Sequence, residues 1–439
     1  MTDMRKARSE LVKDAVIYQV NLRVFTEEGN LAAAARHLPE VAATGANVLY
    51  LCPLMETDSD EDVRNWSDRQ RESLCGNPRN PYRIKDYYHV DAEYGSDEDF
   101  RSFVEAAHRL GLKVMLDLVY LHAGPAFGKA HPDFVMKDES GNVKLNQWHF
   151  CVLDFNVPEL REYLWQNMVY WVREFGMDGF RCDVGGGIPL DFWCEGRRRC
   201  EKVKQPLLML NEADIASRPA DQDEAFDINY ANHWITLLDG ISRKRMNAVG
   251  LEYYWNRTET ARRGAVVLRA LENHDYANDN YYGRIETLSS AKCDASYVLS
   301  FTVTGVPFLY NGCEHCDTSR HSIFGKPGQF FIDRSKDPAP RTALLHKLAE
   351  LHRSEPAIRD GSMQWLPNSA PAVLCTYRRV APSGEAVFCA VNFGNEPVVA
   401  TCAEAEAFAG GQVLLERDSS IQASSLTLGA NGFLVIKGN

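Results

Sequence analysis

Short apolar runs recur along the first three quarters of the chain, and longer stretches with polar residues at helical spacing lie between them. Strands buried on both faces read as nearly continuous apolar runs, whereas the intervening stretches are typical of amphipathic helices. This alternation predicts βα units in an α/β fold, and eight runs is the number that closes a TIM (β/α)8 barrel. The candidate strands are Ala15–Val20, Asn47–Cys52, Lys113–Val119, Gly179–Asp183, Leu207–Asn211, Ala225–Asn229, Val266–Leu271 and Val306–Tyr310.

Two helices between these runs carry clear end signals. The stretches Asp97–Leu110 and Pro158–Phe175 each begin with acidic residues and stop at a glycine, Gly111 and Gly176. Two insertions follow strand ends, where barrel enzymes place substrate loops. Met55 to about Asp86 is polar and rich in arginine and asparagine, and residues 123–157, after the third strand, are rich in glycine, histidine and aromatic residues. We expect the second to be a small inserted subdomain, with residues 1–122 and 158–353 forming the barrel.

Beyond about Ser354 the pattern changes to short alternating segments, AVLCTYRRV, EAVFCAVNF, GGQVLLER and GFLVIKG, separated by turn residues. Alternation with period two indicates strands that are buried on one face only. We therefore expect residues 354–439 to form a C-terminal antiparallel β-sandwich domain.

Composition narrows the choice of partner and compartment. The 439 residues carry 48 basic and 60 acidic side chains, a net charge of −12, which argues against a nucleic-acid or anionic-membrane partner and suits a neutral substrate. No apolar run approaches the roughly 20 residues of a membrane span, and no signal peptide is visible. The 12 cysteines, many within apolar segments, favour a reducing compartment, so we expect a cytoplasmic protein. The oligomeric state stays open.

Two smaller motifs have alternative interpretations. Cys313-Glu-His-Cys316 has the spacing of a redox motif or half a zinc site, but no second such pair accompanies it, so its role stays open. The run Arg197–Arg199 is expected to be a solvated helix face.

Four acidic residues lie at or just beyond the carboxyl ends of candidate strands: Asp117, Asp183, Glu212 and Asp275. Taken singly, each of them could have a structural role instead, because Asp commonly caps the helix that follows a strand. Four together on one face of a barrel would repel and raise one another's pKa values, an arrangement that acid/base chemistry needs and fold stability does not.

Two of these acids suit glycosidic cleavage with retention, which needs a nucleophilic carboxylate and a carboxylic acid about 5–5.5 Å apart. Asp183 and Glu212 end consecutive candidate strands and are 29 residues apart, a length that fits one βα unit. Arg181 lies two residues before Asp183 and so on the same side of that strand, where a guanidinium would hold the nucleophile ionised.

At these positions the chain resembles the α-amylase family of retaining glycoside hydrolases (glycoside hydrolase family 13). Four segments resemble the family's signature segments in order: DLVYLH at 117–122, GFRCD at 179–183, Glu212, and ENHD at 272–275. The segments NPYRIKDY at 80–87 and LDFN at 153–156 resemble its further motifs. The likeness extends from about Ala15 to Asn311, and the ordered set is far more specific than any single segment.

The resemblance implies a role for each matched residue. Asp183 would be the nucleophile, Glu212 the general acid/base, and Asp275 a third carboxylate that grips sugar hydroxyls. Four side chains would surround or stack on the sugar, although ordinary core packing is the alternative for the two histidines and the tyrosine: Tyr82, His122, Arg181 and His274. Asp117 would be structural, fixing Arg181 or its loop.

Departures from the family pattern bear on the calcium site. Where many amylases carry a calcium-ligating Asn before the histidine, this chain has Leu121, and the loop Thr26–Asn30 lacks the acidic alternation that suits calcium. We therefore expect no metal or other cofactor.

Four aromatic residues of the second insertion are candidates for sugar stacking, with core packing equally open: Phe127, Phe134, Trp148 and Phe150.

These observations predict a retaining α-glycosidase that hydrolyses α-glucosidic bonds in α-glucans or maltooligosaccharides through a covalent glycosyl-enzyme. One alternative is a transglycosylase or a sucrose- or trehalose-type enzyme of the same family. Another is a catalytically inactive carbohydrate-binding relative. Linkage stays open, as does endo or exo action, which we expect to depend on whether the 123–157 insertion closes the non-reducing side.

Overall fold

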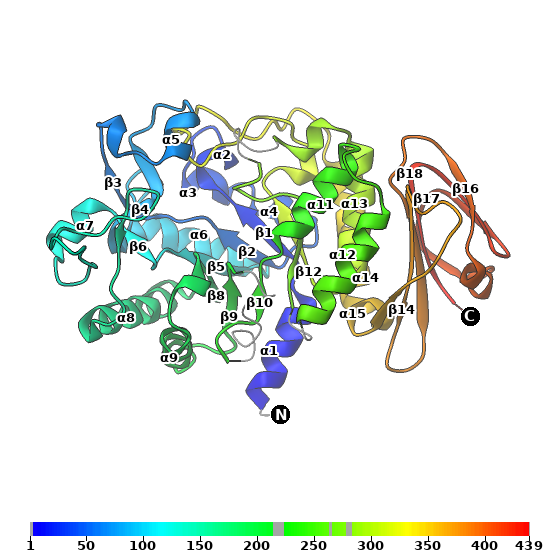
Figure 1. Ribbon diagram of the computed structural model, residues 1–439, viewed down its shortest axis with the longest axis horizontal. Helices are drawn as coiled ribbons and strands as arrows, with labels where there is room; N and C mark the ends of the chain where they lie inside the picture. Colours follow the sequence, from blue (N-terminus) through cyan, green and yellow to red (C-terminus); the bar gives the residue numbers. More distant parts are fainter. Residues whose placement is uncertain (1–2, 214–223, 263–265, 278–282, 439) are drawn as a thin grey trace.

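The computed structural model describes residues 3–213, 224–262, 266–277 and 283–438 (Figure 1). Eight parallel strands form a sheet in the order β10-β9-β8-β5-β2-β1-β12-β11, and a parallel bridge between Asn229 and Val267 joins its two edges into a barrel. Each strand lies within its predicted range, so the predicted barrel is confirmed. The strands are β1 (Ile17–Val20), β2 (Val48–Leu51), β5 (Lys113–Leu118), β8 (Gly179–Cys182), β9 (Leu208–Asn211), β10 (Ile228–Asn229), β11 (Leu268–Ala270) and β12 (Val306–Tyr310).

Side chains of the barrel strands alternate between two cores, which explains why the strands read as unbroken apolar runs. Tyr18 and Val20 of β1 belong to the large cluster shared with the surrounding helices. Ile17 belongs instead to a second cluster, which fills the barrel interior and to which every barrel strand except β8 contributes. Of the residues on these strands, only Lys113 at the start of β5 is partly exposed, and the others are buried.

Helices cover the outside of the barrel (Figure 1). Helix α6 (Asp97–Arg109) begins with a capping box between Ser96 and Asp99, and α8 (Pro158–Phe175) ends at Gly176, whose φ of 69° is left-handed. Both helices match their predicted ranges. The others are α1 (Asp3–Asp14), α2 (Leu22–Phe25), α3 (Leu31–Ala35), α4 (Leu38–Ala43), α9 (Leu190–Cys200), α11 (Asn232–Ser242), α12 (Val249–Arg262), α13 (Ser290–Thr302), α14 (Ala339–Ser354) and α15 (Pro356–Arg359).

The two insertions form small structures above strand ends. The first contains an antiparallel pair, β3 (Met55–Ser59) with β4 (Arg79–Val90), and the short helix α5 (Asp68–Glu72). The second, after the third barrel strand, contains α7 (Pro125–Ala130) and pairs β6 (His122–Ala123) with β7 (Cys151–Val152). Five 3-10 helices complete the described elements: η1 (Val63–Asn65), η2 (Gly185–Gly187), η3 (Ile285–Thr287), η4 (Cys313–His315) and η5 (Ala403–Phe408).

The C-terminal strands form an antiparallel sheet with its own apolar core, beside α13 and α14 (Figure 1). One half of β18 pairs with β15 and the other with β16, while β17 pairs along both halves, so the sheet folds over its core as the predicted β-sandwich. Its strands are β13 (Ser362–Trp365), β14 (Leu374–Val380), β15 (Ala386–Asn392), β16 (Val398–Thr401), β17 (Gln412–Gln422) and β18 (Ser425–Lys437). The domain boundary at 353/354 stays a prediction.

The expectation that Arg197–Arg199 is a solvated helix face is wrong for its first member. Arg197 is 2% exposed and donates to Asp227, to Glu201 and to two backbone carbonyls, because it lies on the face of α9 that packs against the barrel. Arg198 does face solvent and pairs with Glu195.

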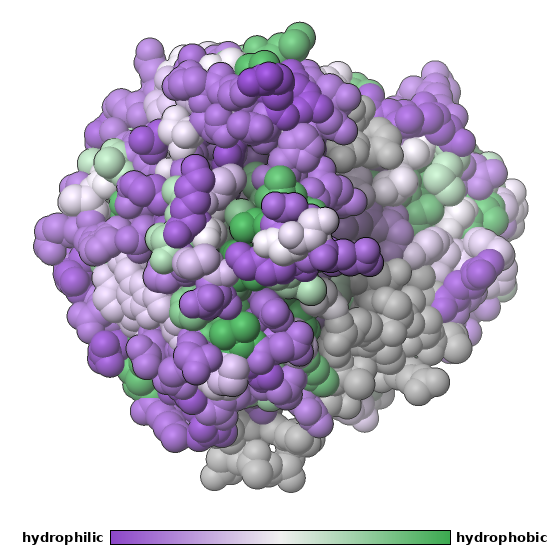
Figure 2. Space-filling model, turned by 60° about the vertical axis from the view of Figure 1, so that its left-hand side comes forward, coloured by the Kyte–Doolittle hydropathy of each residue, from purple (hydrophilic) through white to green (hydrophobic). Residues whose placement is uncertain are grey.

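The surface offers no broad apolar face in the view that brings α7 and α8 forward, where apolar atoms form small patches among hydrophilic ones (Figure 2). Among the described helices, none has the length and apolar character needed to cross a membrane.

Candidate active site

A pocket opens where the barrel strands end at their carboxyl side, and it contains nearly every residue predicted for the site. It also contains residues that the sequence did not single out. The described lining residues are Ser67, Arg69, Asn80, Tyr82, His122, Trp148, Phe150, Arg181, Asp183, Val184, Glu212, His274, Asp275, Ile323 and Phe324.

Arg181 connects three carboxylates at the base of this pocket. Its Nη1 donates to both oxygens of Asp117, at 2.7 and 2.9 Å, and to Oδ1 of Asp183 at 2.7 Å. Its Nη2 lies 2.8 Å from Oε2 of Glu212. The guanidinium is 1% exposed, so these charge-assisted contacts act in a medium that screens them weakly.

Strand pairing explains why these residues meet. Asp117 of β5 stands opposite Arg181 of β8, and the backbone N–H of Glu212 donates to the carbonyl of Cys182 at the end of β8. Asp183 and Glu212 therefore follow adjacent strands at the same height. Because the two terminal nitrogens of a guanidinium are close together, the carboxylates bound to them must also be close neighbours.

Asp117 contacts Arg181, as its predicted structural role requires, and that role stays a prediction. It is fully buried, and besides Arg181 it accepts a 2.7 Å hydrogen bond from the hydroxyl of Tyr50. These donors compensate its charge and hold Arg181 in place beneath Asp183.

Val184 places a further donor on Glu212. It has a left-handed backbone, with φ 42°, which is rare for a β-branched residue. In this conformation its N–H donates to Oε2 of Glu212 at 2.8 Å. Burial raises the pKa of Glu212 to about 8, against the attraction of Arg181 and with the help of the negative charges of Asp183 and Asp275. Glu212 is accordingly a carboxylic acid near neutral pH.

Asp275 stays ionised by contrast. Its Oδ1 accepts a 2.7 Å hydrogen bond from Nη1 of Arg69, which comes from α5 in the first insertion. Burial alone raises the pKa of Asp275, but His274, which is protonated at the low pH where Asp275 titrates, and the Arg69 guanidinium outweigh that effect and hold the pKa below its usual range. Glu212 and Asp275 thus have opposite protonation states in one pocket, as acid/base chemistry requires.

His274 is fixed as a neutral ring. Its backbone N–H donates to Oε1 of Gln19, which leaves the amide nitrogen of Gln19 to donate to Nδ1 at 2.7 Å. The proton of the ring must then be on Nε2, which lies 2.7 Å from the hydroxyl of Tyr82. Burial lowers the pKa of His274 to about 4, consistent with this tautomer. Tyr82 stacks on the imidazole with an interplanar angle of 16°.

His122 lies in an aromatic wall built by the second insertion. It stacks on Phe150 at 4.7 Å between ring centroids, with Trp148 at 5.6 Å, and among the described residues neither ring nitrogen has a hydrogen-bond partner of ordinary geometry. Trp148 and Phe150 line the pocket, whereas Phe127 and Phe134 pack together with Tyr163 away from it. Core packing therefore accounts for Phe127 and Phe134, and sugar stacking stays a prediction for Trp148 and Phe150.

Arg69 and Gln19 were missed by the sequence analysis. The first insertion was recognised as rich in arginine, but no local signal distinguishes Arg69 from Arg64, Arg71 or Arg79. Gln19 lies in a buried strand with no motif around it. Both act through contacts across more than 200 residues of chain.

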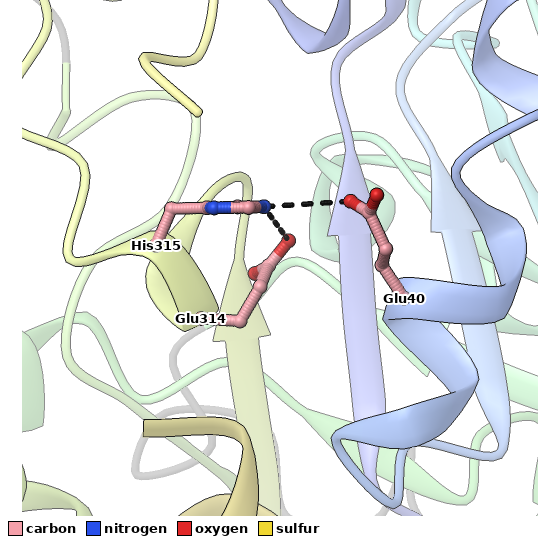
Figure 3. A group of neighbouring side chains, drawn as sticks. All are labelled: Glu40, Glu314 and His315. Carbon is pink, nitrogen blue, oxygen red and sulfur yellow. Dashed lines mark hydrogen bonds and ion pairs between the residues drawn. The ribbon is translucent and has the colours of Figure 1, made fainter. Parts of the chain in front are cut away.

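One group of side chains in the described ranges could bring three metal ligand atoms together, and it lies outside the pocket (Figure 3). Nε2 of His315 is 3.4 Å from Glu40 and 3.9 Å from Glu314. Glu314 also accepts from the hydroxyl of Tyr18, and Glu40 pairs with His37, so these contacts have a structural explanation as a bridge between η4 and α4. Neither sulfur of Cys313 or Cys316 belongs to this group, and all twelve cysteines are free thiols.

The closed barrel with a crowd of carboxylates at its strand ends defines a (β/α)8-barrel protein with an acid/base site. In comparison with known proteins, residues 13–151 match the family model for the α-amylase catalytic domain.

Individual relatives are distant. The chain is 26% identical to α-amylase MalA of Haloarcula japonica over 88% of its own length and 56% of that protein, and 24% identical to a cyclomaltodextrinase of a Bacillus species over 77% and 61%. It therefore spans little more than half of these curated relatives. Among solved structures it resembles the maltogenic α-amylase AmyB of Thermotoga neapolitana, with a TM-score of 0.79, 25% identity and coverage of 97% and 98%. It also resembles an α-amylase of Lactobacillus plantarum, with a TM-score of 0.80, 24% identity and coverage of 98% and 100%.

Proposed function

We propose that the protein is a retaining α-glycosidase that hydrolyses α-glucosidic bonds in α-glucans or maltooligosaccharides. The carrying observation is the Arg181 guanidinium, which binds Asp183 and Glu212 side by side. The relatives named α-amylase and cyclomaltodextrinase support this substrate class.

The first chemical step uses the contrast between the two carboxyl groups. Oδ1 of Asp183 accepts from Arg181, whereas Oδ2 is buried with no hydrogen-bond partner within the described chain, so Oδ2 has lone pairs free to attack the anomeric carbon. As that bond forms, Glu212 gives its proton to the glycosidic oxygen, and the leaving sugar departs as an alcohol. The product is a glycosyl ester on Asp183.

The second step reverses the roles. Glu212, now ionised, takes a proton from water, whose oxygen attacks the anomeric carbon and releases Asp183. Two inversions give net retention. Asp275 is positioned to accept hydrogen bonds from sugar hydroxyls, and the aromatic faces of Tyr82 and Phe150 suit the apolar face of a glucose ring.

Two further parts of the proposal concern metals and location. We propose that catalysis needs no metal, because Arg181 already stabilises the nucleophile and the side chain of Leu121 offers no oxygen ligand. Retention of activity after dialysis against a chelator tests this. We also propose a cytoplasmic location, which the free thiols favour and cell fractionation tests.

The function is tested by the products and by two variants. The wild type should release the α-anomer first from maltoheptaose, as followed by NMR. Asp183→Asn should lose activity on both maltoheptaose and α-glucosyl fluoride. Glu212→Ala should still react with the fluoride, whose leaving group needs no proton, and azide should accelerate its turnover. Asp191→Asn, an exposed acid on α9, is the control.

Each contrary outcome has a distinct meaning. Unchanged cleavage by Asp183→Asn would refute the site. Dominant disproportionation with an added sugar acceptor would favour the transglycosylase or the sucrose- or trehalose-type alternative. Absence of any cleavage by the wild type would favour the inactive carbohydrate-binding relative.

A further inference from the structure

Two loops from opposite ends of the sequence join into one wall beside the pocket. We call residues 67–77 and 320–329 the loop wall; they follow β2 and β12, the two strands that flank β1. Three hydrogen bonds to backbone carbonyls tie them together: Arg320 Nη2 to Ser73 at 2.7 Å, Asn77 Nδ2 to Gly325 at 3.0 Å, and Gln329 Nε2 to Cys75 at 3.4 Å. Cys75 Sγ also donates to the hydroxyl of Ser322 at 3.5 Å.

Buried side chains also pack between the two loops of this wall. Cys75, Ile323 and Phe324 form a separate buried apolar cluster between the loops. Beneath them, Arg23 is 1% exposed and donates to the carbonyl of Ile323 at 2.7 Å and to that of Arg79 at 3.3 Å. Arg23 comes directly after β1, so the wall is supported from the barrel and its position is well determined.

Arg69 attaches the wall to the catalytic carboxylates. It lies on α5 within the wall, faces the pocket together with Ile323 and Phe324, and donates to Asp275 at 2.7 Å. Its guanidinium lies 5.8 Å from the centroid of the Phe324 ring. The pocket is therefore bounded on this side by a salt bridge and an aromatic side chain.

Barrel geometry places the wall opposite the proton donor. In the closed order of eight strands, β9 is four steps from β1 in either direction, and Glu212 directly follows β9. Because Glu212 protonates the bond that breaks, the leaving part of the substrate extends on the side of Glu212. The non-reducing end of the bound unit must then point toward the loop wall.

We propose that the loop wall blocks further sugar units at the non-reducing side, so that the enzyme attacks chains from that end, with Arg69 and Phe324 as the residues that set this specificity. This inference rests on the proposed glycosidase function. The sequence left open whether the 123–157 insertion closes this side; in this proposal closure comes from the β2 and β12 loops, and Trp148 and Phe150 of the insertion line another part of the pocket.

The test uses two forms of maltoheptaose, one unmodified and one whose terminal non-reducing glucose carries an ethylidene group across O4 and O6. An enzyme that cuts internal bonds cleaves both, since the block lies far from most of its cleavage points. The expected result is cleavage of the unmodified chain, with the blocked chain cleaved at least about tenfold more slowly.

Variants that open the wall locate the effect. Arg69→Ala and Phe324→Ala should each raise the ratio of blocked to unblocked cleavage about tenfold or more. Arg71→Ala is the matched control, because Arg71 lies on the same short helix but donates to Trp66 and Asp68 outside the pocket. Thermal unfolding confirms that each variant is folded, and Arg69→Lys should recover part of the wild-type ratio.

The outcomes separate the two claims. Equal cleavage of both chains by the wild type, or an unchanged ratio in both folded opening variants, would overturn the blocking wall and leave the glycosidase function standing. Cleavage of neither chain would overturn the proposed function and this inference with it.

Discussion

Gln19 determines the tautomer of His274. Because its Oε1 accepts from the backbone N–H of His274, its amide nitrogen is the atom that faces Nδ1, at 2.7 Å. An imidazolium would direct an N–H at this amide nitrogen, so the neutral ring with its proton on Nε2 is the favoured form.

Replacing Gln19 with Glu should therefore raise the pKa of His274 above about 4, because a carboxylate next to Nδ1 stabilises a proton there. We expect kcat to fall by up to about 100-fold, since the altered ring moves Tyr82 at the sugar site. A histidine-selective NMR titration measures the pKa. Gln166→Glu, on the exposed face of α8, should leave both quantities unchanged. An unaltered His274 pKa in the Gln19 variant would refute this account.

The pH–rate profile should report Glu212. Since Glu212 acts as an acid in the first step and its pKa is about 8, kcat/KM on maltooligosaccharides should hold below that pH and decline above it. In Glu212→Ala with α-glucosyl fluoride the alkaline decline should disappear, because no proton is needed. A decline at the same pH in the variant would assign it to another group.

The stability of the protein should also depend on pH through Glu212, and the direction of that dependence can be stated. The pKa of Glu212 is raised above the ordinary glutamate value of 4.5, so its contribution to stability is fully present below pH 4.5 and is lost as pH rises through about 8. Glu212→Gln mimics the protonated acid and should gain stability relative to the wild type at pH 9 but not at pH 4. Thermal unfolding at both pH values tests this, and an equal difference at both would contradict it.

The Arg181→Lys substitution should strongly destabilise the protein, because a lysine has only one nitrogen in place of the two guanidinium nitrogens that contact three carboxylates at once. Leaving buried Asp117 and Asp183 incompletely paired should cost about 3–5 kcal/mol of the free energy of unfolding. Urea denaturation measures this loss. Arg198→Lys, an exposed pair with Glu195, should have no measurable effect. A variant as stable as the wild type would show that Arg181 does not bind these carboxylates as described.

Arg379 should join the C-terminal sheet to the barrel. It is 1% exposed and donates to the carbonyl oxygens of Thr302, Ile358 and Gly361 at 2.6 to 2.8 Å. Arg379→Met would leave these buried acceptors without their donor, and we expect a loss of about 3 kcal/mol or more. Faster proteolysis near residue 354 than in Arg378→Met, whose arginine contacts Gln364 at the surface, would support both the contact and the predicted boundary. Equal protease sensitivity would refute it.

The residues at the strand ends could be predicted from the local sequence pattern. Asp117, Arg181, Asp183 and Glu212 could be assigned to one site because eight buried strands must close, and their carboxyl ends must then meet on one face. The spacing of Arg181 and Asp183 by two residues placed them on the same side of β8, and they are hydrogen-bonded. A periodicity of the backbone was sufficient for these predictions.

Arg69 and Arg197 are residues whose contacts the local sequence pattern did not predict. Both stand in short arginine-rich stretches that suggest solvent, yet one contacts Asp275 across 206 residues and the other is buried against Asp227. Whether an arginine is solvated or paired depends on what the rest of the chain places opposite it, and nothing within a few residues records that.

The sequence by itself determined the barrel, the order of its strands, the C-terminal β-domain and the set of carboxylates, because periodicity and strand-end position are local properties that survive in any arrangement consistent with burial. Only the tertiary structure decided the protonation states of Glu212 and Asp275, the tautomer of His274 and the loops that bound the pocket. Each of these depends on burial and on contacts between segments far apart in the chain, and such contacts arise only when the barrel closes.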